Sequence, residues 1–521
     1  MRHTPTRWPE RVWPPPSNTI ESSTQRLADK LESMPHNTPA PVSRAQKLQL
    51  GLAMALAGVL YVAHSFLRFA NFESRGYDLG IFDQAARQYA MFKAPIVPIK
   101  GVDFNLLGDH FHPILVLLAP FYWIWNDPRM LGIVLTLLLI STAIPVYLFT
   151  RPRFGHLGAL LTASAMLLWW PFQAIVNWEF HEVAFGVPIM AWIIWAFDRS
   201  RHWLVVGLSA VLLLVREDMG ITLVAVGIVM LFHKQWAKAA LLAVAGLGGY
   251  VVVTSYLIPL FSPAGEFTYW QYTALGASAG AAILFLLTHP FQSIAILFDH
   301  QLKVALWLLS FLPLALLPLA SPYVILGAPM LLSRLFNDRL NTWAPVYQYD
   351  AIMAPILILS AVHVLGKLME RFGWKKIRVI APAWLLAFAL VGTLFFHSVF
   401  PLGRTLTGAN WAPGSLVAAK ERAVAMIPDG VCVEAADTLV PHLTTRTYVG
   451  MHGDIGTELS NWMIIDFNEQ ELGGWDPLNP PQALARAHAL GFEEVAPIDE
   501  GLLVLHRDIP VAPACSDYLK R

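Results

Sequence analysis

Acidic and histidine side chains gather in two short segments of the chain, and such side chains can transfer protons or bind metal ions. They are Asp78 and Asp83 within Tyr77–Gln84, and Asp109, His110 and His112 within Gly108–Pro113. A carboxylate can serve as a general base, and carboxylates combined with histidines are common ligands of divalent cations. Asp78, Asp83 and Asp109 are therefore candidate catalytic residues, and Asp78, Asp109 and His112 are candidate metal ligands.

Asp78 also has a purely structural interpretation. It stands at the start of a predicted helix over residues 77–92, where an Asp commonly accepts backbone N–H bonds as an N-cap. Capping occupies one carboxylate oxygen, so the two roles are compatible. Asp83 lies five positions further on, on a different face of that helix, so the spacing does not require a close pair of acids. For Asp109 and the histidines, hydrogen bonding to lipid headgroups is the alternative.

Two later segments hold groups of the same kind. They are Glu179, His181 and Glu182, and Arg216, Glu217 and Asp218. Charges at the ends of membrane spans usually pair with each other or extend to the interface. Three such groups on one side of a helical bundle would nevertheless meet in one pocket. We therefore expect substrate binding by these residues: His110, His112, Glu179, His181, Glu182, Arg216 and Glu217.

Several basic residues are placed to meet a phosphate group, because a guanidinium binds phosphate oxygens bidentately. They are Arg68, Arg75, Arg216, Lys303, Arg334 and Arg339. Arg334 precedes a loop rich in aromatic rings and amides, Trp343–Tyr349. This composition suits a sugar ring, although an aromatic belt at the membrane interface has the same composition. Arg334, Gln348 and Tyr349 complete the predicted substrate-binding residues.

The composition indicates which elements position these residues. The chain has 521 residues, 36 basic and 36 acidic, so its formal net charge is zero. Charged residues make up 14% of it and hydrophobic residues 56%, against about 25% and 45–50% in soluble domains. A soluble multidomain enzyme, a disordered chain and a basic nucleic-acid-binding protein are therefore excluded, and an α-helical polytopic membrane protein is expected.

A spanning helix needs about 20 mostly apolar residues, and about eleven segments approach this length. They are residues 48–68, 130–150, 157–172, 183–198, 203–216, 219–233, 237–261, 303–320, 322–335, 345–366 and 379–399. Together they define a predicted transmembrane domain over residues 48–400. Residues 1–47, rich in Pro, Ser, Thr and Arg, are expected to form a disordered cytoplasmic tail.

Basic residues indicate the orientation of these spans, because Lys and Arg favour cytoplasmic loops. They cluster in the N-terminal tail and in the loops after the second, fourth, sixth and tenth spans. This pattern predicts a multi-pass protein of the cell membrane with a cytoplasmic N-terminus and an extracytoplasmic C-terminus. Residues 77–92 and 113–125 are expected to be interfacial helices in the first outer loop, and 262–301 is expected to be an outer loop.

After residue 400 the pattern changes to short strands and helices. Strands are expected at Val431–Glu434, Tyr448–Val449, Met463–Asp466 and Leu502–Leu505, and helices at Ser415–Met426 and Pro481–Leu490. Residues 401–521 hold sixteen acidic and eight basic residues, which suits the outside better than the anionic cytoplasmic membrane surface. We therefore predict a small extracytoplasmic α/β domain at 401–521.

The chain has two cysteines, Cys432 and Cys515, and both fall in this predicted outer domain. Disulfides form and persist in oxidising compartments, so a bond between the two is a hypothesis. Their separation along the chain does not by itself require pairing.

Six segments together carry a resemblance to a known family over about residues 50 to 510. They are Tyr77–Gln84, Gly108–Pro113, Glu179–Glu182, Arg216–Asp218, Gln348–Tyr349 and Leu439–Arg446. The chain resembles the uncharacterised membrane family called domain of unknown function 2079. That family is similar to the GT-C fold glycosyltransferases, which use polyprenyl-phosphate-linked sugars.

The resemblance implies a role for Asp78. In GT-C enzymes an acidic residue early in the first outer loop acts as a base or a metal ligand, and Asp78 occupies that place here. Many of them have two adjacent acids, whereas Leu79 follows Asp78 in this chain. A second acid would then come from Asp83, Asp109 or Glu179.

These observations predict an integral-membrane glycosyltransferase that uses a lipid-phosphate-linked sugar on the extracytoplasmic face. Asp78 would deprotonate the acceptor hydroxyl, and an Arg or a bound cation would stabilise the leaving phosphate. The expected partners are membrane lipid, a polyprenyl-phosphate sugar donor and an envelope glycan, lipid or protein acceptor, without nucleic acid. A divalent cation is the candidate cofactor. The alternative is a transporter or a lipid or glycolipid flippase, whose acids would be spread through the bilayer instead of clustered at one face.

Overall fold

The computed structural model describes residues 41–520, except residues 457, 475 and 497. The chain divides into two units, residues 1–44 and 45–521, and only the second is described below. Most of the predicted N-terminal tail, residues 1–40, therefore lies outside the described residues. Residues 41–47 of the predicted tail are described, and helix α2 begins within them, at Arg44.

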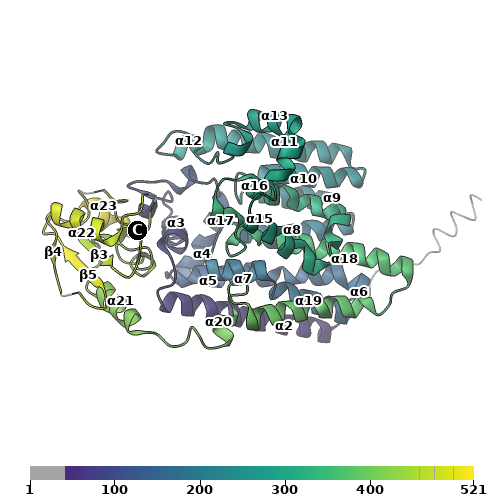
Figure 1. Ribbon diagram of the computed structural model, residues 1–521, viewed down its shortest axis with the longest axis horizontal. Coiled ribbons are helices and arrows are strands. Elements are labelled where there is room, and N and C mark those ends of the chain that lie inside the picture. The colour runs from purple at the N-terminus through teal and green to yellow at the C-terminus, as the bar shows by residue number, and fades with distance from the viewer. Residues whose placement is uncertain (1–40, 457, 475, 497, 521) are drawn as a thin grey trace, which may run out of the picture. The chain divides into compact units, whose positions relative to one another are not determined.

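Apolar helices cover almost every predicted span and run alongside one another (Figure 1). The longer ones are α2 (Arg44–Ala70), α5 (Arg129–Ser141), α6 (Ala143–Leu167), α8 (Val183–Asp198), α9 (His202–Leu212), α10 (Met219–Phe232), α11 (Trp236–Val252), α15 (Gln301–Phe311), α18 (Met353–Phe372) and α19 (Ile377–Phe395). Shorter helices, within the spans or between them, are α3 (Ile81–Ala90), α4 (Ala119–Ile124), α7 (Trp170–Trp178), α12 (Ile258–Phe261), α16 (Ala328–Phe336), α17 (Leu340–Trp343) and α20 (Gly403–Leu406). The helices α3 and α4 lie where the two interfacial helices were expected, and their placement at the interface stays a prediction.

Five helical stretches in the described part of the chain are long and apolar enough to cross a membrane. They are Arg44–Ala70, Arg129–Trp178, Trp236–Phe261, Gln348–Phe372 and Ile377–Phe395. The second contains two of the predicted spans, because α6 is broken at Gly155, where φ is 74°. Shorter apolar helices of 10–17 residues occupy the other predicted spans, so the expected count of about eleven depends on whether these also cross.

The expectation of an outer loop at 262–301 is wrong in part, because this segment contains two helices. They are α13 (Ala279–Thr288) and α14 (Pro290–Ile296), which are bent by 110° relative to each other. Only together are the two helices long and apolar enough to form a sixth span. His289 and Pro290 interrupt the apolar run, which is why neither half reaches the length of a spanning helix.

Small residues allow α10 and α11 to pack with their backbones in contact. A Cβ added at Gly246 would lie 2.3 Å from the Gly220 carbonyl oxygen, and one added at Gly220 would lie 2.5 Å from that of Gly246. Close packing at small residues is a common way for membrane helices to associate. The contact between Gly220 and Gly246 fixes the start of α10. It thereby also fixes the charged segment Arg216–Asp218, which directly precedes this helix.

The C-terminal part of the chain forms a five-stranded sheet in the order β2-β1-β3-β5-β4. The strands are β1 (Cys432–Ala435), β2 (Tyr448–Gly450), β3 (Trp462–Asp466), β4 (Glu493–Glu494) and β5 (Leu502–His506). β1 pairs in parallel with β2 and β3, and β5 pairs antiparallel with β3 and β4. The accompanying helices are α21 (Ser415–Ala425), α22 (Pro480–Ala489) and α23 (Pro513–Tyr518). Four strands and two helices lie where the sequence predicts them, whereas the domain boundary at residue 400 and its extracytoplasmic side stay predictions.

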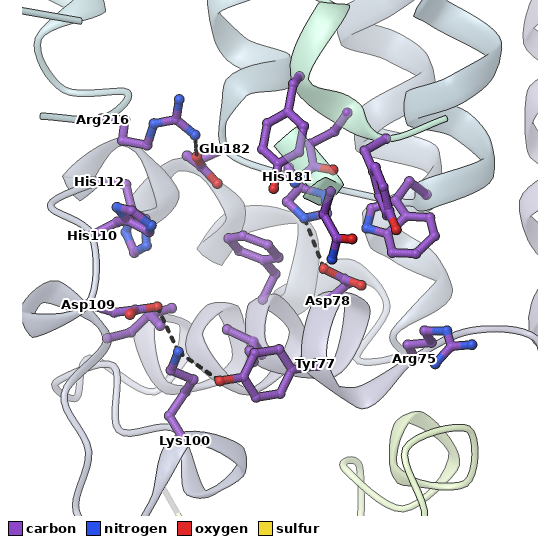
Figure 2. Close-up of a pocket in the computed structure, with 18 of the residues that line it drawn as sticks. Arg75, Tyr77, Asp78, Lys100, Asp109, His110, His112, His181, Glu182 and Arg216 are labelled. Atoms are coloured by element: carbon purple, nitrogen blue, oxygen red, sulfur yellow. Dashed lines mark hydrogen bonds and ion pairs between the residues drawn. The ribbon is translucent and has the colours of Figure 1, made fainter. Parts of the chain in front are cut away.

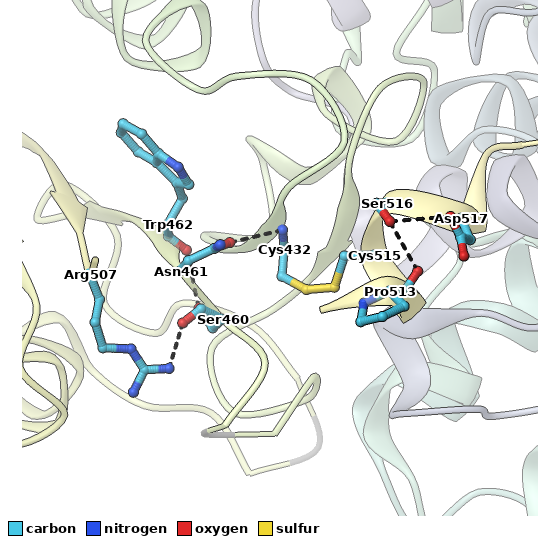
Figure 3. The surroundings of a disulfide bond; sticks show 9 residues. All are labelled: Cys432, Ser460, Asn461, Trp462, Arg507, Pro513, Cys515, Ser516 and Asp517. Atoms are coloured by element: carbon cyan, nitrogen blue, oxygen red, sulfur yellow. Dashed lines mark hydrogen bonds between the residues drawn. A yellow bond between two sulfur atoms is a disulfide. The ribbon is translucent and has the colours of Figure 1, made fainter. Parts of the chain in front are cut away.

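A disulfide joins β1 to the last helix. Cys432 and Cys515 are paired, with their Cα atoms 5.5 Å apart (Figure 3), and both are buried. From the same helix, the Tyr518 hydroxyl donates to the Ile96 carbonyl at 2.8 Å, and the Gln88 amide donates to the Tyr518 carbonyl at 3.3 Å. The disulfide therefore ties the sheet to the segment that follows α3.

Replacing both cysteines by serine should destabilise this connection. The bond closes a loop with a sequence separation of 83, and loss of such a cross-link typically costs about 2–5 kcal/mol in the free energy of unfolding. We expect the double variant to unfold at a lower temperature than the wild type in detergent. Two free thiols in denatured, unreduced wild-type protein would contradict the pairing.

Candidate functional site

A cavity of about 490 Å³ lies between the first loop, the start of α8 and the segment before α18 (Figure 2). Its walls contain most of the charged and aromatic residues that the sequence analysis singled out. The polar and aromatic lining residues are Arg75, Tyr77, Asp78, Phe82, Lys100, Asp109, His110, His112, Trp178, His181, Glu182, Arg216, Tyr269, Arg339, Asn341, Tyr347, Gln348, Tyr349 and Asp437. The volume falls within the range of about 300–1,000 Å³ that is usual for ligand pockets.

Asp78 reaches this cavity from a single π-turn, η1 (Gly76–Gly80), that directly precedes α3. The side chain does not act as the predicted N-cap, because the N-cap positions of η1 and α3 are Arg75 and Gly80. The turn packs closely on other parts of the chain. A Cβ at Gly76 would lie 2.8 Å from Val440, and one at Gly80 would lie 2.8 Å from Ile99.

Asp437, from the C-terminal sheet region, holds the same turn in place. Its carbonyl accepts from the Gly76 N–H at 2.8 Å, and its Oδ1 accepts from the Tyr77 N–H at 3.0 Å. Its Oδ2 accepts from the Arg75 guanidinium at 3.1 Å. The orientation of Asp78 therefore depends on a residue more than 350 positions away in the sequence.

His181 is the direct partner of Asp78. Its Nε2 lies 3.2 Å from Asp78 Oδ1, and its Nδ1 lies 3.3 Å from the Glu179 carbonyl oxygen. Both ring nitrogens thus face acceptors, and only the imidazolium form can donate to both. Burial lowers the pKa of His181, but the hydrogen bond and charge of Asp78 outweigh this, and the net shift is upward.

Glu179 supports this arrangement from outside the cavity. Its buried carboxylate accepts a hydrogen bond from the Ser74 hydroxyl, just before the turn that carries Asp78. Its backbone adopts φ 78° and ψ −169°, a region that is costly for any residue except glycine. This strain is retained where the chain turns from α7 to present the His181 ring to Asp78.

Lys100 and Asp109 form the opposite wall of the cavity. Lys100 Nζ lies 3.2 Å from Asp109 Oδ2 and 3.2 Å from the Tyr77 hydroxyl, and the Tyr269 hydroxyl donates to Asp109. Burial raises the pKa of Asp109, but the charges of Lys100 and His110 reverse this, so the pKa is lowered. Asp109 is therefore held as a paired anion.

The charged groups before α10 are also paired with each other. His110 Nδ1 lies 2.7 Å from Glu217; burial lowers the pKa of His110, but the charge and hydrogen bond of Glu217 raise it to about 9 overall. Arg216 donates to both oxygens of Asp218 at 2.8 and 2.6 Å and to Glu182 at 3.2 Å. These pairs hold ionic groups in a partly buried site, where an unpaired charge would be costly.

Four of the predicted site residues do not line this cavity. Asp83 is fully buried; both of its oxygens accept from Arg87 Nη2, at 2.9 and 2.8 Å, and Tyr122 donates to Oδ1 at 2.7 Å. The charge of Asp83 is therefore compensated by Arg87 inside the protein, away from the cavity. Glu179 lies behind the cavity, and Glu217 and Arg334 line a second, adjoining one.

The predicted metal-ligand set of Asp78, Asp109 and His112 is not brought together. Within residues 41–520, as far as they are described, no group of three or more His, Cys, Asp or Glu side chains is placed to hold a metal ion. Asp78 is bound to His181, and Asp109 is bound to Lys100. The residues present therefore do not fit the expected divalent-cation site.

The cavity also includes residues that were not predicted as its lining. They include Tyr77, Lys100, Trp178, Tyr269, Asn341, Tyr347 and Asp437. Lys100 lies 22 positions after Asp78 in a loop without a hydropathy signal, and only the tertiary fold brings it to Asp109. Tyr77 lies in the segment Tyr77–Gln84 and directly precedes Asp78, so its place in the cavity could have been predicted from that position.

The pKa of Glu179 leads to a prediction about stability. Burial raises this pKa from 4.5 to about 7, although the charge of Arg68 and the Ser74 bond oppose the shift. Between these values the folded protein binds more protons than the unfolded chain, so the free energy of unfolding falls as pH rises through this window. Glu179→Gln keeps an acceptor for Ser74 but does not titrate. We expect the wild type to lose thermal stability between about pH 4.5 and 7 more steeply than this variant.

The exposed acid Glu421 supplies the control for this measurement. Glu421→Gln, on α21, should leave the pH dependence of the unfolding temperature unchanged. Equal slopes for the wild type and Glu179→Gln would show that Glu179 ionises normally in the folded protein.

Comparisons with known proteins agree with this architecture. No curated protein matches the chain. Among solved structures, ArnT from Cupriavidus metallidurans bound to undecaprenyl phosphate matches with a TM-score of 0.52 and 14% identity, over 89% of this chain and 98% of that chain. The oligosaccharyltransferase of Archaeoglobus fulgidus in complex with Zn and sulfate matches with a TM-score of 0.42 and 13% identity, over 88% and 74%.

The likeness to ArnT concerns the fold, and the expected similarity to the GT-C fold is confirmed. The family assignment comes from the sequence: the model described as "Predicted membrane protein (DUF2079)" matches residues 68–478. Because this match covers most of the chain, the protein belongs to the DUF2079 family of predicted membrane proteins.

Proposed function

We propose that the protein is an integral-membrane glycosyltransferase that takes a sugar from a lipid-phosphate donor on the extracytoplasmic side. The observation that supports this most directly is the cavity itself. It combines an accessible carboxylate, Asp78, with several cationic side chains. A base for the acceptor and positive charge for the departing phosphate are the two requirements of such a transfer.

Asp78 is suited to act as the base. Its side chain keeps 19% exposure at the cavity wall, and its Oδ1 is held by His181, which leaves Oδ2 to take up a proton. In the proposed step an acceptor hydroxyl oxygen forms a bond to C1 of the donor sugar while the bond from C1 to the phosphate oxygen breaks. The hydroxyl proton passes to Asp78, and the electron pair of the broken bond leaves with the phosphate.

Cationic side chains of the chain itself are available for the phosphate. Arg339 is exposed at the edge of the cavity, and Arg216 and Lys100 lie in its walls. A guanidinium pairs with phosphate oxygens in a planar, bidentate geometry. Arg339 is the strongest candidate, because Arg216 is already engaged by Asp218 and Glu182 and Lys100 by Asp109.

The C-terminal part of the chain contributes to the same site. Asp437 lines the cavity and fixes the turn that carries Asp78. We propose that the region after residue 400 orients an envelope glycan, lipid or protein acceptor beside Asp78. Five acids from the three loops, Asp78, Asp109, Glu182, Glu217 and Asp218, lie around this cavity or the one adjoining it, which favours an enzyme over a transporter or flippase.

Asp78→Asn tests this function. Asn still accepts a hydrogen bond from His181 but cannot take up the proton of an acceptor hydroxyl. A general base contributes about 10²–10⁴ in rate, so transfer should fall by that factor while the unfolding temperature stays close to that of the wild type. The measurement is transfer from radiolabelled lipid-phosphate sugars in membranes at matched expression.

A matched control lies in the same loop. Asp103 is exposed and does not line the cavity, so Asp103→Asn should transfer sugar at the wild-type rate. Near-normal transfer by Asp78→Asn would reject Asp78 as the base.

A further inference from the structure

A second cavity of about 190 Å³ adjoins the first one. The two share a wall made of His110, Arg216, Tyr269, Arg339 and Tyr349. An engineered protein cavity of about 150 Å³ holds a benzene molecule, so the second cavity has room for one six-membered ring. Its position beyond the shared wall makes it distinct from the space around Asp78.

The lining of the second cavity combines aromatic rings with hydrogen-bonding groups. Tyr250, Trp270 and Tyr272 supply rings, and Trp270 and Tyr272 are edge to face with centroids 5.1 Å apart. Asn337 and Thr342 supply an amide and a hydroxyl. Aromatic faces beside a few polar groups suit a ligand with apolar C–H faces and several hydroxyls, which describes a sugar ring.

Arg334 is held in the wall of this cavity by two partners. The Arg334 side chain is 7% exposed; its Nε donates to the Thr342 carbonyl at 2.7 Å, and its Nη1 pairs with Asp350. Its Nη2 is buried without a hydrogen bond. Thr342 and Asp350 therefore fix the Arg334 guanidinium in the wall of the second cavity.

Charge pairing around the cavity indicates an uncharged ligand. Arg334 is balanced by Asp350, Arg216 by Asp218 and His110 by Glu217. Arg339 forms no ion pair with any of the described residues. It lies in the wall that the two cavities share. The interior is thus nearly neutral, and the uncompensated positive charge lies at the junction with the first cavity.

We propose that the second cavity binds the glycosyl group of the donor, that this group is an uncharged monosaccharide, and that Arg339 meets the donor phosphate at the junction. The inference rests on the proposed function and adds the class of sugar. With the ring held by Trp270 and Tyr272, C1 faces the first cavity, where the acceptor lies beside Asp78.

Binding of soluble methyl glycosides to the purified full-length protein in nanodiscs tests this assignment. The probes are methyl glucoside, methyl mannoside, methyl galactoside and methyl glucuronide, followed by saturation-transfer NMR with competition to obtain relative affinities. At least one of the three uncharged glycosides should bind, and the glucuronide should bind more weakly than the glucoside. Binding of none of the uncharged probes, or tighter binding of the glucuronide, overturns the proposal.

Variants place the binding in the second cavity. Trp270→Ala and Tyr272→Leu should each weaken glycoside binding about fivefold, the loss expected for about 1 kcal/mol of ring contact. Trp236→Ala is the matched control, because Trp236 is 68% exposed on α11 and lines neither cavity. Unchanged affinity in both cavity variants, with their unfolding temperatures preserved, overturns the assignment.

Asp78→Asn separates this inference from the proposed function. It should lower transfer by a factor of about 10²–10⁴ and leave glycoside binding intact. Sugar transfer by wild-type protein that binds no glycoside would overturn the subsite alone. Glycoside binding that depends on Trp270, in a protein without any transfer activity, would support the subsite and reject the glycosyltransferase function.

Discussion

The contact between Asp78 and His181 is the interaction on which the site depends. It joins the turn Gly76–Gly80 to the segment between α7 and α8, two parts of the chain that are more than 100 residues apart. On the other side, Asp437 binds the same turn through its carbonyl and its carboxylate. Asp78 is thereby held between a helical part and a sheet-forming part of the protein, and neither alone would fix its position.

This constraint explains several local features that would otherwise be costly. Glycine at positions 76 and 80 allows Val440 and Ile99 to approach the turn. Glu179 accepts an unfavourable backbone conformation, and its carbonyl and carboxylate bind His181 and Ser74. Strain at such a position persists only where surrounding contacts determine it, and here they serve to aim one carboxylate into a cavity.

Much of this fold could be predicted from the sequence, because hydropathy reports directly on membrane helices. The α8 helix, Val183–Asp198, coincides with its predicted span, and the strands β1, β2, β3 and β5 lie within two residues of their predicted positions. The bent pair α13 and α14 was missed because each half is too short for a spanning-helix criterion.

The site was predictable only in part, because some of its residues are far apart in the sequence and because a local pattern does not show where each side chain points. The acids and histidines of three loops do meet, as expected for segments on the same side of a bundle. Asp83, however, faces into the protein against Arg87, and the spacing from Asp78 could show only that the two acids face apart. Lys100 and Asp437 come to the cavity through tertiary contacts that no local pattern encodes, and the same holds for the second cavity around Trp270.

Under the proposed function, the protein transfers a sugar to a component of the cell envelope. The most direct test is mass spectrometry of envelope lipids, glycans and proteins from a strain lacking the gene, compared with the same strain carrying the wild-type or the Asp78→Asn chain. We expect one envelope component to lose a monosaccharide in the deletion strain and to regain it only with the wild-type chain. An unchanged envelope, or full restoration by the Asp78→Asn chain, would contradict it.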